Sequence, residues 1–177
     1  MEKSHSRRHN LALIGFMGSG KSTIGPILAS RLDMSFVDLD DSIAAEAGMD
    51  IGEIFSREGE EGFRSRESKA LRRELQGEGK VIACGGGIVL REKNVELLRA
   101  RSLVFYLRVG RKTALERLGD GEGRPLLRGE ALPERVENLM AAREARYREA
   151  AHFVVEAESG DPEAIAGEIA DTWKEYR

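Results

Sequence analysis

A glycine-rich motif near the N-terminus limits what this chain can fold into more than any other feature. The residues from Gly15 to Ser22 read Gly-Phe-Met-Gly-Ser-Gly-Lys-Ser and match the pattern G-x-x-x-x-G-K-[S/T]. The motif follows a short apolar segment and precedes a segment of helical pattern. A phosphate loop needs both neighbours, because its backbone N–H groups and the positive end of the helix must meet at the phosphates. The sequence therefore predicts an α/β sheet with a nucleoside triphosphate site at the end of its first strand.

Each residue type in this loop has a physical reason to be there. Gly18 and Gly20 let the backbone approach phosphate oxygens without a side chain in the way. Lys21 is expected to reach the β and γ phosphates, and the hydroxyl of Ser22 to bind Mg²⁺. The expected nucleotide-binding residues of the loop are Gly18, Ser19, Gly20, Lys21, Ser22 and Thr23.

The rest of the chain alternates short apolar segments with segments of helical period. The segments expected to be strands are Leu11–Gly15, Ser35–Leu39, Val81–Cys84, Ser102–Leu107 and Phe153–Val155. The segments expected to be helices are Gly20–Arg31, Glu60–Gln76, Arg91–Ala100, Lys112–Leu118, Leu132–Ala150 and Asp161–Tyr176. Continuous apolar strands separated by helices are typical of a mostly parallel sheet covered on both faces. The predicted fold is therefore a three-layer α/β/α sandwich.

Two stretches depart from a simple strand–helix repeat. Residues 40–76 are helical in pattern throughout, with breaks near Gly48–Gly52 and at Gly59, and are predicted to form an inserted helical region. Residues 119–129 combine glycines with two arginines, which suits either a mobile loop that closes over an anion or a plain solvated loop. We expect a flexible basic tail at 1–10 and a single domain at 11–177.

The ionisable residues exclude several function classes. The chain has 28 Lys plus Arg, 31 Asp plus Glu, 3 His and 1 Cys, for a net charge of -3. A single cysteine, Cys84, cannot form an internal disulfide or a multi-thiolate metal site, and it is expected to be buried and structural. The net negative charge of the chain argues against a nucleic-acid partner. No apolar run reaches the ~20 residues that span a bilayer. We expect a cytoplasmic protein that uses carboxylates, arginines and backbone groups.

Acidic residues follow the second apolar segment. In open α/β sheets, ligands collect outside the carboxyl ends of the strands, so Asp38 and Asp40 are expected to face the phosphate loop. Two residues apart on a strand, they would point to the same side, one toward a metal ion and the other toward a second substrate. Asp41 would point away and cap the next helix. The alternative is that these acids serve only helix capping and solubility.

Several motifs, taken in order, resemble the shikimate kinase family. They are Gly15 to Ser22, Asp38-Leu39-Asp40, Glu60-Glu61-Gly62-Phe63-Arg64, Gly85-Gly86-Gly87, Arg124-Pro125-Leu126-Leu127, and Arg143 with Tyr147. The resemblance covers about residues 10 to 175 and implies a five-stranded parallel sheet of the P-loop, nucleoside-monophosphate-kinase type. It also implies a helical substrate-binding region at about 40–76, a mobile lid at about 111–130, and transfer of the γ-phosphate of ATP to the 3-hydroxyl of shikimate with Mg²⁺.

The resemblance also implies roles for individual residues. Ser22 and Asp38 would form the metal site, and Asp40 would orient the attacking hydroxyl as a late base. Lys21 and Arg124 would be catalytic with Asp40, and Arg117 would stack near the adenine. The implied shikimate-binding residues are Asp40, Arg64, Gly86, Gly87 and Arg143. Arginine suits a carboxylate clamp because its planar guanidinium binds bidentately.

Other interpretations stay open. A gluconate kinase-like enzyme would share the phosphate loop, and a catalytically silent relative would bind nucleotide only. Gly160 stands where some family members have an arginine near the adenine, which leaves base selectivity open. We expect shikimate and ATP as the partners, no nucleic acid or membrane, and a monomer.

Overall fold

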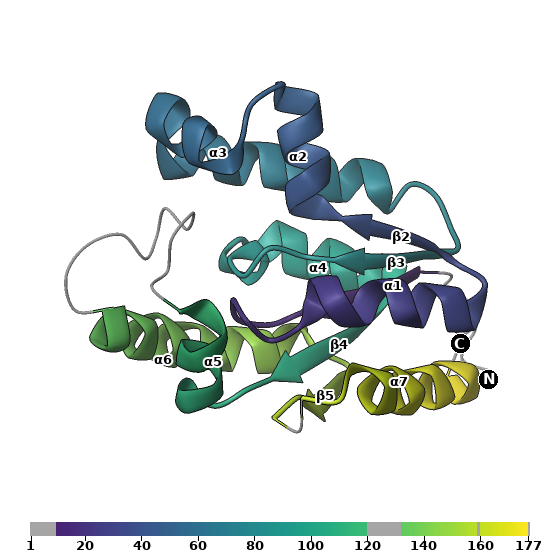
Figure 1. Cartoon of the computed structure of the whole chain (residues 1–177). Coiled ribbons are helices and arrows are strands. Elements are labelled where there is room, and N and C mark those ends of the chain that lie inside the picture. The colour runs from purple at the N-terminus through teal and green to yellow at the C-terminus, as the bar shows by residue number, and fades with distance from the viewer. Residues whose placement is uncertain (1–9, 120–131, 159, 177) are drawn as a thin grey trace.

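The computed structural model describes residues 10–119, 132–158 and 160–176. Strands and helices alternate along the chain, and the two helices of the inserted region lie together beyond one edge of the sheet (Figure 1). The strands are β1 Asn10–Ile14, β2 Ser35–Asp38, β3 Lys80–Ala83, β4 Ser102–Arg108 and β5 Phe153–Glu156. The α-helices are α1 Lys21–Leu32, α2 Leu39–Ala47, α3 Ile51–Glu74, α4 Glu92–Arg101, α5 Arg111–Leu118, α6 Leu132–Ala150 and α7 Pro162–Tyr176, with a 3₁₀ turn, η1, at Ile88–Leu90.

The five strands form one parallel sheet in the order β2-β3-β1-β4-β5. Helices α1 and α7 pack together, and α4 and α6 contact each other and β4 (Figure 1). The predicted three-layer parallel fold is confirmed. Its physical basis is that the central β1 is buried throughout and apolar from Leu11 to Ile14, as a strand covered by helices on both faces requires.

The first strand, β1, begins one residue earlier than predicted. Asn10 is buried at the start of β1, where its Nδ2 donates to the Gly77 carbonyl at 2.7 Å and its Oδ1 accepts from the Lys80 N–H at 3.0 Å. A polar residue can be buried there because both ends of its amide are hydrogen-bonded. At the other end, β1 stops at Ile14, so Gly15 belongs to the loop and not to the strand.

The second strand is shorter than predicted, and this changes how the acids are held. β2 ends at Asp38, and Leu39 is the first residue of α2, so Asp40 lies in a helical turn and not on a strand. The side chain of Asp38, and not that of Asp41, caps this helix by accepting from the Asp40 N–H at 3.0 Å. The helix begins here, and the strand does not continue, because the Asp38 side chain satisfies a backbone N–H of the first helical turn. Leu39, the first residue of the helix, is fully buried.

The inserted helical region consists of α2 and α3, which pack on each other. α3 has a break at Gly59, as predicted, where φ is 71° and ψ is -178°. This conformation is open essentially only to glycine. The ion pair between Glu58 and Arg66, with N–O distances of 2.7 and 2.8 Å, joins the two halves of α3 across the break. The break therefore sets the direction of the second half, which carries Arg64. None of the helices described is long and apolar enough to cross a membrane.

Candidate active site

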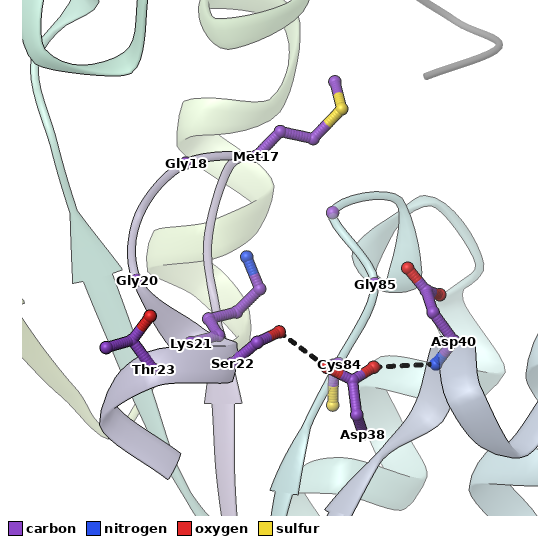
Figure 2. A pocket seen from close by; sticks show the side chains of 11 residues that line it. Met17, Gly18, Gly20, Lys21, Ser22, Thr23, Asp38, Asp40, Cys84 and Gly85 are labelled. Carbon is purple, nitrogen blue, oxygen red and sulfur yellow. Dashed lines mark hydrogen bonds between the residues drawn. The ribbon is translucent and has the colours of Figure 1, made fainter. Parts of the chain in front are cut away.

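The segments at the carboxyl ends of three adjacent strands line one cavity of about 210 Å³. They are the loops after β1 and β3 and the junction of β2 with α2, and Figure 2 shows the loop after β1 facing the other two. From β1 the chain first crosses to β2 on one side of the sheet, and from β3 it later crosses to β4 on the other side. The carboxyl end of β1 is therefore a topological switch point, where ligands of open α/β sheets bind. The lining residues are Met17, Gly18, Gly20, Lys21, Ser22, Thr23, Asp38, Asp40, Cys84, Gly85 and Gly86.

The loop after β1 has the backbone that a phosphate site requires. Gly18 and Gly20 have φ angles of 78° and 96°, in the left-handed region that favours glycine. Gly20 is the N-cap of α1, so the free N–H groups of the first helical turn lie beside the cavity. Lys21 Nζ donates to the carbonyls of Gly15 at 2.8 Å and Phe16 at 2.9 Å. Backbone amides, a helix terminus and an ammonium group therefore meet at one place.

Ser22 and Asp38 are joined by a hydrogen bond at the floor of the cavity (Figure 2). Ser22 Oγ donates to Asp38 Oδ2 at 2.6 Å, while Asp38 Oδ1 caps α2. A hydroxyl and a carboxylate oxygen are the hard ligands that Mg²⁺ prefers. Among the residues described there is no cluster of three or more His, Cys, Asp or Glu that could hold a metal. A Mg²⁺ shared with nucleotide phosphates needs only one or two protein ligands, so this pair is sufficient.

Asp40 is an acid without a full set of hydrogen bonds. Its Oδ1 is buried and has no hydrogen-bond partner among the described residues. Burial raises the pKa of this carboxyl above its usual 3.8, the nearby Asp38 raises it further, and Lys21 and Arg64 oppose both effects. A buried oxygen without a partner at a cavity wall is a place where a hydroxyl can donate.

A buried ion pair lies beside Asp40. Arg64 Nη1 donates to Glu67 Oε2 at 2.9 Å, and the two side chains are 7% and 0% exposed. Burial raises the pKa of Glu67, and the charge and hydrogen bond of Arg64 oppose this. Sequence reasoning missed Glu67, although a position three residues after Arg64 in a helix lies on the same face. Glu67 Oε1 and Arg64 Nε have no hydrogen-bond partner among the described residues, so the pair has capacity to bind a polar ligand.

The glycine run after β3 packs directly against these charged side chains. A Cβ atom at Gly87 would lie 2.3 Å from the Arg64 guanidinium, and one at Gly85 would lie 2.6 Å from Glu67 Oε1. Gly86 and Gly87 were predicted as substrate-wall residues; Gly86 lines the cavity, whereas Gly87 makes room for Arg64. Gly85, the first residue of this run, also lines the cavity. The loop must be glycine so that it can approach the ion pair.

Arg143 and Arg117 reach the site from other elements. Arg143 is buried on α6 and donates to the Gly86 carbonyl at 3.3 Å. Arg117 on α5 donates to the carbonyls of Gly18 and Ala157, both at 3.0 Å. It also borders a second cavity of about 190 Å³ lined by Gly20, Thr23, Ile24, Arg117, Gly160, Pro162 and Ile165. This second cavity adjoins the phosphate loop through Gly20 and Thr23.

Two further predictions concern residues near the site. Cys84 is 2% exposed, and burial raises the pKa of its thiol, so it is the buried cysteine that was expected. Arg124, predicted to be catalytic, lies outside the described residues, as does most of the predicted lid.

A phosphate loop alone is common to nucleotide hydrolases and transferases. Here the cavity extends past the loop to Asp40, and the Arg64–Glu67 pair and Arg143 adjoin it, although phosphates do not need these groups. A second set of hydrogen-bonding groups at the switch point indicates a second, small and polar substrate. The fold and the site therefore define the class of P-loop kinases that act on small molecules.

Comparison with known proteins narrows this class. The family model described as shikimate kinase matches residues 17–174. A shikimate kinase of Thioalkalivibrio sulfidiphilus is 45% identical over 161 residues, which cover 91% of this chain and 85% of the relative. One of Thermodesulfovibrio yellowstonii is 40% identical over 167 residues, which cover 94% of each protein. The chain belongs to the shikimate kinase family.

Solved structures agree with this assignment. Shikimate kinase from Acinetobacter baumannii in complex with shikimate superposes with a TM-score of 0.93 at 34% identity, over 97% of this chain and 96% of that one. Shikimate kinase from Aquifex aeolicus gives a TM-score of 0.82 at 32% identity, over 93% and 96%. A deoxyadenosine kinase from M. mycoides, at 18% identity and a TM-score of 0.59, shares the fold alone.

Proposed function

We propose that this protein transfers the γ-phosphate of ATP to the 3-hydroxyl of shikimate, giving 3-phosphoshikimate and ADP. The observation that carries the proposal is the continuous cavity from the phosphate loop to Asp40, with a buried arginine–glutamate pair behind it. Family membership and the similarity to a kinase solved with shikimate support this acceptor.

The acceptor half of the site uses three kinds of groups. The unpartnered Oδ1 of Asp40 accepts a hydrogen bond from the attacking hydroxyl and so orients its oxygen. Asp40 then takes up the proton of that hydroxyl late in the transfer. Arg64 and Arg143 bind the carboxylate of shikimate, since a buried guanidinium offers directed donors to a planar anion. Gly86 lines the cavity beside Arg143. Positioning and charge stabilisation are sufficient, because phosphoryl transfer needs no strong base.

The nucleotide half uses the loop after β1. Backbone amides from Gly18 to Thr23 and the ammonium group of Lys21 bind the phosphates. The position of Arg117 beside the second cavity supports a contact with the base. Arg124 is proposed as the cation over the transferred phosphoryl group; this role comes from the family resemblance alone.

We propose Mg²⁺ as the metal that accompanies ATP, held by Ser22 and Asp38. When bound, Mg²⁺ neutralises charge that develops on the phosphate oxygens. The hydrogen-bonded hydroxyl and carboxylate pair has the donor chemistry for this ion. We expect a monomer and a cytoplasmic location, where ATP is available.

Replacing Asp38 by Asn should raise the concentration of free Mg²⁺ needed for half-maximal rate by about 10–100-fold. An amide oxygen still caps α2, because Asn and Asp cap helices equally well, but it lacks the charge that attracts the ion. Steady-state rates across a Mg²⁺ titration measure this shift. Asp41→Asn is the matched control, since Asp41 is exposed beside it and should leave the titration unchanged. An unchanged Mg²⁺ requirement in the Asp38 variant would remove this residue from the metal site.

The test of the proposed function is ADP release that depends on shikimate. We expect release from ATP to require shikimate and Mg²⁺ together and to stop when EDTA is added. A protein that binds ATP but releases no ADP with shikimate would instead be the nucleotide-binding relative that lacks activity. A chain that keeps Lys21, Ser22, Asp38 and Asp40 around one cavity favours the active enzyme.

A further inference from the structure

Tyr147 is a buried side chain of α6 that the reaction described above does not use. Its hydroxyl donates a hydrogen bond to the Gly86 carbonyl at 2.5 Å, and the residue is 1% exposed. Arg143, four residues earlier on the same helix, donates to the same oxygen at 3.3 Å. One carbonyl oxygen therefore has two donors, and the more distant of them is an arginine proposed to bind the substrate carboxylate.

The Gly86 carbonyl depends on α6 for its position. The carbonyls on either side of it are used within the loop itself: Gly85 accepts from the Ile88 N–H at 3.1 Å, and Gly87 accepts from the Leu90 N–H at 3.0 Å. The hydrogen bonds of Gly86 instead come from the side chains of α6. The short bond from Tyr147 therefore sets where this part of the cavity wall lies.

The hydroxyl and the guanidinium differ in what they can do next. Burial raises the pKa of Tyr147 to about 12, so its hydroxyl stays protonated and donates a hydrogen bond throughout the neutral range. Arg143 has several donors and a long bond to Gly86. Without the hydroxyl, the Gly86 carbonyl would keep only Arg143, and an acceptor left with one weak bond attracts the nearest charged donor. Arg143 would then be drawn toward the loop and away from an incoming carboxylate.

We propose that Tyr147 is a positioning residue that holds the Gly86 carbonyl and so keeps the Arg143 guanidinium available for the carboxylate of the acceptor substrate. The inference rests on the proposed function, because it concerns how the acceptor is bound. Tyr147 does not contact the reacting atoms in this scheme; it acts through Arg143 and Gly86.

Tyr106 provides a matched control. Its ring stacks on that of Tyr147 with centroids 5.0 Å apart, and it is likewise buried, at 3% exposed. Its hydroxyl, however, donates to Glu144 at 2.5 Å and not to the glycine loop. Removing either hydroxyl leaves the stacked rings in place, but only one removal affects Gly86.

The test compares Tyr147→Phe with Tyr106→Phe in the full-length enzyme. In Tyr147→Phe, KM for shikimate should rise at least about fivefold, with kcat and KM for ATP within about twofold of the parent. Tyr106→Phe should leave all three constants within about twofold. A merely structural role would instead reduce the fraction of active enzyme, which lowers the apparent kcat and leaves both KM values unchanged.

A double-mutant cycle with Arg143→Ala makes the test specific. If Tyr147 acts through Arg143, the change to Phe should add no further rise in KM for shikimate when Arg143 is already absent. An unchanged KM in Tyr147→Phe, an equal rise in both backgrounds, or a variant that no longer folds by circular dichroism would each overturn the inference. Failure of the proposed function is a different result, because the parent enzyme itself would then not phosphorylate shikimate.

Discussion

An Asp40→Asn enzyme should bind ATP as tightly as the parent and transfer phosphate about 10²–10⁴-fold more slowly. The carboxylate is replaced by an amide of the same shape, which cannot take a proton from the acceptor hydroxyl. Lys21 and Ser22 are unchanged, and the backbone N–H of residue 40 keeps its bond to Asp38, so the nucleotide site should remain intact. ATP binding by calorimetry and turnover with shikimate measure the two halves separately.

The same substitution should increase the stability of the folded protein although it lowers activity. Burial and the charge of Asp38 raise the pKa of Asp40 in the folded state, so its ionisation disfavours folding once the pH exceeds the unfolded pKa. That penalty is absent at low pH and grows as the pH rises through the folded pKa. The Asn variant should therefore have a higher Tm than the parent at pH 8, with the difference shrinking toward pH 4. Turnover near the parental level would contradict the role of Asp40, whatever the stability.

Loss of Arg64 should affect both activity and folding. In Arg64→Ala, kcat/KM for shikimate should fall by about 10²–10³-fold, because a buried, charged donor to the carboxylate is removed. The variant also leaves the Glu67 carboxylate buried without its partner, and breaking a buried ion pair in this way costs about 3–5 kcal/mol. Chemical denaturation and steady-state kinetics with shikimate check the two effects.

The stability loss in Arg64→Ala should depend on pH. Burial already raises the pKa of Glu67, and removing Arg64 takes away the group that opposes this. The folded variant should therefore be most stable at acidic pH, where Glu67 is protonated, and should lose stability as the pH rises above the unfolded pKa. Adding Glu67→Gln should restore stability at neutral pH without restoring activity. Recovery of activity in the double variant would show that Arg64 serves the fold and not the substrate.

The sheet and the phosphate loop could be predicted because their signals are local. Strands buried on both faces are continuous apolar runs, and the motif from Gly15 to Ser22 can work only between a strand and a helix. The break at Gly59 could also be predicted, since glycine within a helical pattern is a common point of interruption.

The placement of the acids was harder to predict. Asp38-Leu39-Asp40 alternates polar and apolar residues as a strand end does, but the same three residues also suit a helix N-terminus with a capping Asp. Capping chemistry decided the outcome, and both acids still line the cavity. A strand end and a helix N-terminus would therefore both place Asp38 and Asp40 at the cavity.

Glu67 could not be identified from its surroundings in the sequence. It lies in a segment rich in charges, where a pair with Arg64 looks like an exposed helical ion pair. Its burial depends on tertiary packing against Gly85 and Gly87, which approach the ion pair closely. Only the fold brings that glycine loop to the second half of α3.

The substrate specificity of the purified enzyme tests the proposed function most directly. With saturating Mg²⁺ and ATP, kcat/KM is measured for shikimate and for gluconate, and the phosphorylated product is identified by mass and NMR. We expect 3-phosphoshikimate as the product and a far higher kcat/KM for shikimate. Faster phosphorylation of gluconate, or a phosphate on another hydroxyl of shikimate, would contradict it.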